Sequence, residues 1–134
     1  LGKLLNVGLA IVDKRRPKPG QSQVMNVIGD VKGQTCIIVD DIIDSGGTIV
    51  NAAKALKARG AKEVYVYITH GVLSGDAVKK IKNSVIKNLV ITDTIDNGEK
   101  TKMVKNIEVL PISGLMGEAI KRISNSTSVS DLFK

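Results

Sequence analysis

The sequence has almost no cysteine and very few aromatic residues: one cysteine, one phenylalanine, two tyrosines and no tryptophan in 134 residues. A single cysteine excludes an internal disulfide framework, which fits a reducing compartment. Cys36 itself lies in an apolar, β-prone run, where we expect it to be a small core residue. The shortage of aromatic rings disfavours single-stranded nucleic acid as a ligand, because its bases need stacking partners. We therefore expect no nucleic-acid partner.

The sequence also lacks long hydrophobic runs. No stretch of 18 apolar residues is present, and no signal-peptide pattern opens the chain, so we expect a cytoplasmic protein with no membrane partner. The hydrophobic fraction of 43% is nevertheless enough to bury a core. The length is that of one domain, so residues 1–134 are predicted to form a single unit.

The charge is strongly positive. Twenty basic and 13 acidic side chains give a formal net charge of +7, which favours anionic partners. Many lysines, among them Lys79, Lys80, Lys82 and Lys87, fall on a predicted short helix and its flank, where a solvated charged surface is the simplest interpretation. For the other basic residues, small phosphorylated ligands remain a good match.

Apolar and β-branched runs alternate with helical patterns along the chain. Strands are predicted at residues 7–12, 24–28, 35–40, 63–69, 89–92 and 107–110, and helices at 48–59, 76–83 and 113–123, with Gly60 ending the first and Ser113 capping the last. This alternation predicts an α/β fold with a mostly parallel sheet flanked by helices on both faces. Residues 13–23 are predicted to form a mobile loop, and residues 96–106 and 124–134 a polar connection and a polar tail. Residues 1–6 look like the end of a helix whose start is missing, which suggests a fragment of a longer protein.

The most informative segment is VDDIIDSGGT at residues 39–48, between a predicted strand and a predicted helix. We call it the acidic segment. The carboxylates of Asp40 and Asp41 can accept hydrogen bonds from sugar hydroxyls. The two glycines and the helix N-terminus can present backbone N–H groups to a phosphate. A simpler interpretation is that Asp44 or Ser45 only caps the helix, but the segment holds more polar residues than a cap needs. In such sheets ligands bind beyond the carboxyl ends of the strands, which is where this segment lies.

His70 is the only histidine in the sequence. A single histidine after a strand is more often a structural hydrogen-bonding residue than a catalyst, and we expect that role here.

The segment DDIIDSGGT resembles the ribose-5-phosphate loop of type I phosphoribosyltransferase folds. Three further segments, DKRRP at 13–17, THGVLSG at 69–75 and SVSDLF at 128–133, extend the similarity to the ribose-phosphate pyrophosphokinase family, also called phosphoribosyl pyrophosphate synthetases. The resemblance covers essentially the whole chain. It implies the C-terminal, phosphoribosyltransferase-like domain of a longer enzyme whose N-terminal domain is absent.

The resemblance implies a transferase of nucleotide biosynthesis that moves diphosphate from ATP to ribose 5-phosphate, giving phosphoribosyl pyrophosphate and AMP. It also implies magnesium, held mainly by the absent part, with no metal ligands in this fragment. A homo-oligomer, hexameric in the full-length form, and phosphate or ADP as effectors are implied as well. The family's histidine metal ligand belongs to the absent part, so His70 is not its counterpart.

The same resemblance assigns roles to individual residues. Lys14 and Arg16 would be catalytic; fixed cations beside a transferring diphosphoryl group are also what the chemistry requires. Lys14 and Arg16 lie in the predicted loop at residues 13–23. In that loop the family usually has an asparagine and a glutamate where this sequence has Gly20 and Gln23, so the contacts that close the loop would differ. The predicted ribose-5-phosphate-binding residues are Asp40, Asp41, Asp44, Ser45, Gly46, Gly47 and Thr48, and the predicted allosteric residues are Ser128, Ser130 and Phe133.

Two alternatives stay open at this stage. A phosphoribosyltransferase would share the acidic segment, although DKRRP and SVSDLF are not expected in it. A non-catalytic regulatory relative of the synthetases would keep both. For the tail, a frayed terminus anchored by one aromatic ring is the simpler interpretation from residues alone. The 134-residue chain by itself is predicted to be inactive.

Overall fold

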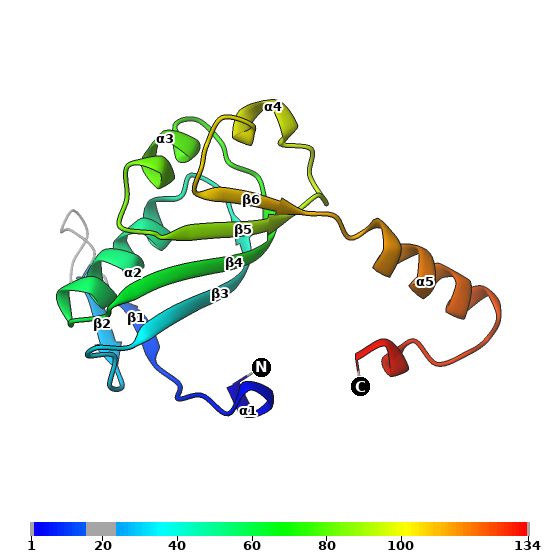
Figure 1. Cartoon of the computed structure of the whole chain (residues 1–134), viewed down its shortest axis with the longest axis horizontal. Coiled ribbons are helices and arrows are strands. Elements are labelled where there is room, and N and C mark those ends of the chain that lie inside the picture. The colour runs from blue at the N-terminus through cyan, green and yellow to red at the C-terminus, as the bar shows by residue number, and fades with distance from the viewer. Residues whose placement is uncertain (1, 16–23, 134) are drawn as a thin grey trace.

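The computed structural model describes residues 2–15 and 24–133. It contains a two-stranded antiparallel ribbon and a four-stranded parallel sheet, with helices between the strands of the sheet (Figure 1). In chain order the elements are α1 (Gly2–Leu5), β1 (Ile11–Arg15), β2 (Val24–Ile28), β3 (Thr35–Ile43), α2 (Gly47–Ala58), β4 (Glu63–Gly71), α3 (Ala77–Lys82), β5 (Asn88–Thr92), α4 (Gly98–Thr101), β6 (Ile107–Leu110), α5 (Ser113–Ser124) and the 3₁₀ turn η1 (Ser130–Phe133).

The four-stranded sheet has the order β3-β4-β5-β6, so each strand lies beside the next one in the chain. All three pairings are parallel, with Ile38 opposite Val66, for example, and Ile68 opposite Ile91. The crossovers through α2 and α3 therefore return the chain to the same edge each time. All four carboxyl ends meet at one edge of the sheet. The predicted α/β class with a parallel sheet is confirmed.

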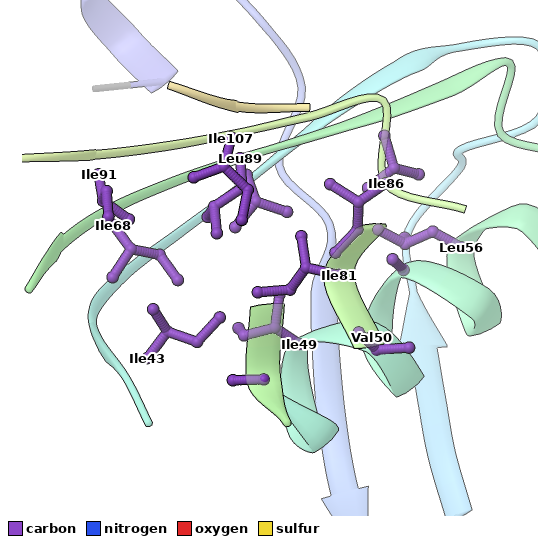
Figure 2. Close-up of a cluster of buried hydrophobic side chains, with 14 of the residues drawn as sticks. Ile43, Ile49, Val50, Leu56, Ile68, Ile81, Ile86, Leu89, Ile91 and Ile107 are labelled. Carbon is purple, nitrogen blue, oxygen red and sulfur yellow. The ribbon is translucent and has the colours of Figure 1, made fainter. Parts of the chain in front are cut away.

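Helices α2 and α3 cover one face of this sheet and bury the core there (Figure 2). Ile49 and Leu56 of α2 and Ile81 of α3 are at most 6% exposed, and they pack in one cluster with Val66 and Ile91 of the strands. The apolar positions of α2 recur three and four residues apart, which places them on a single side of the helix. Burying that side against the β-branched strand residues stabilises the domain.

The other face of the sheet carries exposed apolar side chains in the part of the chain that the structure describes. Ile37, Val39 and Tyr67 are 51%, 57% and 43% exposed. The prediction of helices over both faces is therefore wrong for the described residues. The reason is visible in Figure 1, where α5 runs away from the end of β6 instead of folding back onto the sheet.

Helix α5 forms over the predicted range, but it buries no residue. Its apolar residues, which are spaced four and three apart, are exposed: Met116 by 50%, Ile120 by 63% and Ile123 by 67%. The prediction of Ser113 as N-cap is also wrong, because Ile112 occupies that position and no side chain caps the helix. Periodicity predicts that a helix has an apolar side, but not what that side will contact.

Several predicted boundaries change. Strand β1 begins at Ile11 and runs through Lys14 to Arg15, so residues 13–15 are strand and not loop; the backbone pairing of Lys14 with Met25 extends the ribbon. The predicted polar connection at 96–106 contains the short helix α4, and the predicted tail contains η1. Among the described residues no helix is long and apolar enough to cross a membrane.

The end of α2 follows the sequence prediction closely. Gly60 has a φ of +90°, its N–H donates to the Lys57 carbonyl at 2.9 Å, and the N–H of Ala61 donates to Leu56 at 3.1 Å. This pair of bonds is the Schellman motif, which satisfies carbonyls that the helix leaves unpaired. Gly60 is thus the residue just after the C-cap, Arg59, as predicted.

Candidate functional site

The acidic segment lies at the carboxyl end of β3, the first strand of the sheet. Asp40 and Asp41 are successive residues within β3, so their side chains point to opposite sides of the sheet. Both are exposed, and the N–H of Asp41 donates to Asp40 Oδ1 at 2.9 Å. The strand was predicted to end at Asp40, but pairing of Ile42 and Ile43 with β4 extends it by three residues. Two carboxylates therefore stand near the strand end on a rigid strand backbone.

Three residues after β3 ends at Ile43, Gly46 is the N-cap of helix α2 and has a left-handed conformation, with φ +74°. Only glycine takes this conformation without steric cost. No side chain caps the helix, and its first backbone bond runs from the N–H of Val50 to the Gly46 carbonyl at 3.0 Å. The capping interpretation of Asp44 and Ser45 is therefore wrong.

The N–H groups of Gly47, Thr48 and Ile49 precede that first intrahelical bond. They lie at the positive end of the helix dipole, and the Thr48 side chain beside them is exposed. Such a helix start is suited to binding a phosphate. Carboxylates and unbonded N–H groups thus meet within one short segment.

A second loop, at residues 72–74 just after β4, holds the acidic segment in place. The N–H of Val72 donates to the Ile43 carbonyl at 2.9 Å, and the N–H of Ser74 donates to the Asp44 carbonyl at 3.2 Å. Leu73, which is 1% exposed, has a φ of +49°, a conformation rarely adopted by a leucine. The buried side chain fixes this backbone, and the backbone in turn fixes the acidic segment. The segment at residues 69–75 contributes to the family resemblance, but its sequence does not predict this supporting role.

Lys80 also reaches the acidic segment, which the sequence interpretation as a solvated lysine missed. Its Nζ donates to the Ser45 carbonyl at 3.4 Å and lies 2.7 Å from Asp76 Oδ1. The hydrogen bond from Lys80 holds the pKa of Asp76 below its ordinary value. The spacing of Asp76 and Lys80, four apart on a predicted helix, was the only sequence signal for this arrangement.

The adjacent strand ends carry hydrogen-bonding side chains. His70 Nδ1 lies 2.9 Å from Thr94 Oγ1, and Thr92 Oγ1 donates to the Thr69 carbonyl at 2.7 Å. His70 therefore has the hydrogen-bonded environment expected for a structural histidine. Next to these residues, at the carboxyl ends of β5 and β6, a pocket of about 360 Å³ is lined by Asp93, Thr94, Ile112, Ser113 and Met116. Polar side chains thus lie at the carboxyl ends of β4 and β5.

The remaining predicted site residues are not brought to this edge by described contacts. Lys14 is placed in β1 by its backbone pairing, whereas Arg16, Gly20 and Gln23 lie outside the described residues. Ser128 and Ser130 lie after α5, with their Oγ atoms 3.1 Å apart, and Phe133 is 71% exposed. Whether these residues act with the acidic segment stays a prediction.

Cys36, in β3, is half-buried and packs against the core cluster, and burial raises the pKa of its thiol. This agrees with a packing role.

Residues 2–15 and 24–133 contain no ligand group of the kind that usually holds a metal ion in proteins. No group of three or more His, Cys, Asp or Glu side chains there is arranged to hold an ion. No chemical step is therefore assigned to the magnesium that the family resemblance implies.

The fold and this segment together define a class of protein: an α/β domain with an acidic strand end and a glycine turn at the carboxyl edge of a parallel sheet. Comparison with known families is more specific. The family described as "Phosphoribosyl synthetase-associated domain" matches residues 9–134, and the chain belongs to this family.

Curated relatives agree with the family match. The chain is 61% identical over 133 residues to a ribose-phosphate pyrophosphokinase of Bradyrhizobium diazoefficiens, covering 99% of this chain and 42% of that protein. It is 53% identical over 135 residues to the protein of the same name from Buchnera aphidicola, covering 100% and 43%. The chain thus spans less than half the length of these relatives.

A solved structure agrees as well. The crystal structure of phosphoribosylpyrophosphate synthetase from Mycobacterium smegmatis superimposes with a TM-score of 0.80 at 36% identity, over 92% of this chain and 39% of that one. The resemblance inferred from four short motifs is confirmed.

Proposed function

We propose that this chain is the ribose-5-phosphate-binding part of a ribose-phosphate diphosphokinase. The observation that carries the proposal is the combination of Asp40 and Asp41 with an uncapped helix start at Gly47 and Thr48, in a chain that is 61% identical to a protein named for this activity. A sugar phosphate offers hydroxyls at one end and a dianion at the other, which matches the two halves of the segment.

In the proposed complex the two carboxylates accept hydrogen bonds from the ribose hydroxyls. Asp44, Ser45, Gly46, Gly47 and Thr48 surround the 5-phosphate, which lies against the unbonded N–H groups of α2. The backbone bonds from residues 72–74 and the contact from Lys80 keep the segment in place without ligand, so little ordering is needed on binding.

In the proposed reaction the 1-hydroxyl oxygen of ribose 5-phosphate attacks the β-phosphorus of ATP. A new oxygen–phosphorus bond forms there, and the bond from that phosphorus to the α,β-bridging oxygen breaks. AMP leaves with the electron pair, and the hydroxyl proton is lost. Lys14 and Arg16 are proposed to stabilise the charge that develops on the transferring diphosphoryl oxygens.

ATP and magnesium are proposed to be bound mainly by the part of the full-length relatives that this chain does not span. A homo-oligomer, and an effector site for phosphate or ADP at Ser128, Ser130 and Phe133, belong to the same proposal. The 134-residue chain alone is expected to bind the sugar phosphate without turning it over, because it spans only 42% of its relative's length.

Calorimetric titration of the purified chain with ribose 5-phosphate tests the binding proposal. Asp40→Asn and Asp41→Asn should each weaken affinity by about tenfold or more, since a hydrogen bond to a charged group contributes roughly 1.5–3 kcal/mol. Asp30→Asn is the matched control, because Asp30 is exposed in a distant turn and accepts only a local N–H, from Lys32. Equal affinity in all three variants would refute the ribose assignment.

An AMP-release assay tests the expectation that the 134-residue chain alone does not turn over its substrates. The chain with ATP, ribose 5-phosphate and magnesium should release no AMP above background, and measurable sugar-dependent release would overturn the expectation of inactivity. A phosphoribosyltransferase would instead consume phosphoribosyl pyrophosphate and a base, and a regulatory relative would show neither reaction in the full-length protein.

A further inference from the structure

A basic pocket lies at the edge of the sheet opposite to the candidate site. Its volume is about 630 Å³. Glu63 opens β4, Lys87 precedes β5 and Lys105 lies just before β6, so these residues surround the amino ends of three strands. The acidic segment lies at the carboxyl end of β3. The basic pocket and the acidic segment are therefore separated by the length of the strands. The proposed function makes no use of the pocket.

The charge of the pocket is strongly one-sided. It is lined by five lysines, Lys57, Lys62, Lys82, Lys87 and Lys105, and by one carboxylate, that of Glu63, a net of +4. Like charges that line one pocket repel one another, so a bound polyanion would relieve an unfavourable arrangement.

Two of the five lysines already have partners. Lys87 Nζ lies 3.3 Å from Glu63 Oε1, and this pairing is the main reason why the pKa of Glu63 is below its ordinary value. Lys57 Nζ donates to the carbonyls of Ala61 at 3.0 Å and Lys62 at 2.8 Å. Among the described residues no ion pair engages Lys62, Lys82 or Lys105, so three ammonium groups are available to a ligand.

The wall between these lysines is held by internal hydrogen bonds. Ser84 Oγ donates to the Ile81 carbonyl at 2.8 Å and accepts the N–H of Ile86 at 3.1 Å. Asn106 Nδ2 donates to the same Ile81 carbonyl at 3.2 Å and to the Ile86 carbonyl at 3.4 Å, which ties the turn before β5 to the start of β6. The pocket is therefore preformed.

Two apolar side chains stand exposed beside the charges. Val85 is 41% exposed and Met103 is 85% exposed, and both line the pocket. Methionine in particular packs against flat and irregular ligand surfaces. The pocket thus offers cations and an apolar surface together.

We propose that this pocket binds a small molecule that carries a polyphosphate chain, with the phosphates among Lys62, Lys82 and Lys105. A nucleoside polyphosphate would also place its base on Val85 and Met103, whereas inorganic polyphosphate would use the lysines alone. The volume favours a small ligand over a nucleic acid, and no aromatic side chain lines the pocket for base stacking along a strand.

Two-dimensional NMR titrations of the ¹⁵N-labelled chain with ADP and with tripolyphosphate locate the ligand. Both should shift the backbone signals of Ser84, Val85 and Asn106, at concentrations that leave the signals of Gly47 and Thr48 less perturbed. Tighter binding of ADP identifies a nucleoside polyphosphate, and equal or tighter binding of tripolyphosphate identifies an inorganic chain. Shifts confined to Gly47 and Thr48 would overturn the proposal while leaving the proposed function intact.

Charge variants make the assignment specific. Lys82→Glu and Lys105→Glu should each weaken tripolyphosphate binding by about fivefold at low salt, whereas Glu63→Gln, which removes the only carboxylate of the pocket, should strengthen it. Lys121→Glu on α5 is the matched control, because it makes the same change in net charge on an element that extends away from the sheet (Figure 1). A gain in Glu63→Gln cannot arise from unfolding. Equal loss in Lys82→Glu and Lys121→Glu would overturn the proposal.

Discussion

The ammonium group of Lys80 on α3 lies 3.4 Å from the carbonyl oxygen of Ser45, in the turn that joins β3 to α2. The same ammonium lies 2.7 Å from Asp76, one helical turn earlier. Lys80 thus connects the helix that covers the core to the segment proposed to hold the sugar phosphate. It also places a positive charge beside the proposed phosphate.

Lys80→Ala should weaken ribose-5-phosphate affinity by about two- to fivefold, the range expected for one exposed charge contact. Calorimetric titration measures this. Asp76→Asn is the matched control, since it removes the ion-pair partner but leaves the lysine beside Ser45. Equal effects of the two variants would show that the ion pair matters, and not the contact with the turn.

Gly46→Ala should lower both stability and phosphate affinity. The φ of +74° costs an alanine about 1–2 kcal/mol, and the new methyl carbon would lie 3.7 Å from Ala77 and Ile81. Gly33 has almost the same φ, +72°, with open space around it, so Gly33→Ala is the matched control. Urea unfolding should show a similar loss in both variants, and calorimetry should show weaker ribose-5-phosphate binding only in Gly46→Ala. Unchanged sugar affinity there would contradict the role of the turn.

Gly71 should not accept a side chain. A Cβ atom there would lie 2.6 Å from Ile91 Cδ1 and 3.4 Å from Asn97 Nδ2, which itself donates to the Gly71 carbonyl at 2.6 Å. Gly71→Ala should therefore reduce the free energy of unfolding by roughly 1–3 kcal/mol. Ile91→Val removes the Cδ1 atom in the way, so the double variant should lose less than the two single losses combined. Additive losses in urea unfolding would contradict this steric explanation.

The Glu63 carboxyl should titrate below its ordinary range in a ¹³C NMR pH titration. The hydrogen bond from Lys87 lowers its pKa most, and that from Tyr65 adds to the effect. Because the folded-state pKa is the lower one, the pairing stabilises the fold above the unfolded-state pKa and is lost as the pH falls through the folded-state value. Lys87→Ala should move the pKa upward toward the ordinary value. An unchanged pKa in that variant would show that Lys87 is not the cause.

The sequence predicted the alternation of strands and helices well where local patterns decide the structure. The β-branched runs of β4 and β5, the spacing of apolar residues in α2 and the glycine after it each require only a few neighbouring residues. Boundaries that depend on pairing were less predictable. Strand β3 continues to Ile43, and β1 includes Lys14, because partner strands extend them.

The place of the acidic segment, between a strand and a helix, was equally predictable, whereas its ligand stays a prediction. Two carboxylates, two glycines and a threonine between a strand and a helix indicate sugar-phosphate binding from their chemistry alone. The contacts that hold this segment in place were not predictable. Leu73, Ser74 and Lys80 lie about 30 residues further along the chain, and they bind backbone carbonyls of the segment, which leave no pattern in the sequence.

By itself, therefore, the sequence determined the residue types of the acidic segment, the class of fold and the family. These depend on residue types and on order along the chain, which folding does not change. Only the tertiary structure decided that the helix start is uncapped, that a distant lysine and the loop after β4 fix the turn, and that five lysines meet at the opposite edge of the sheet. Those features arise from parallel strands, which bring segments far apart in the chain to a common edge.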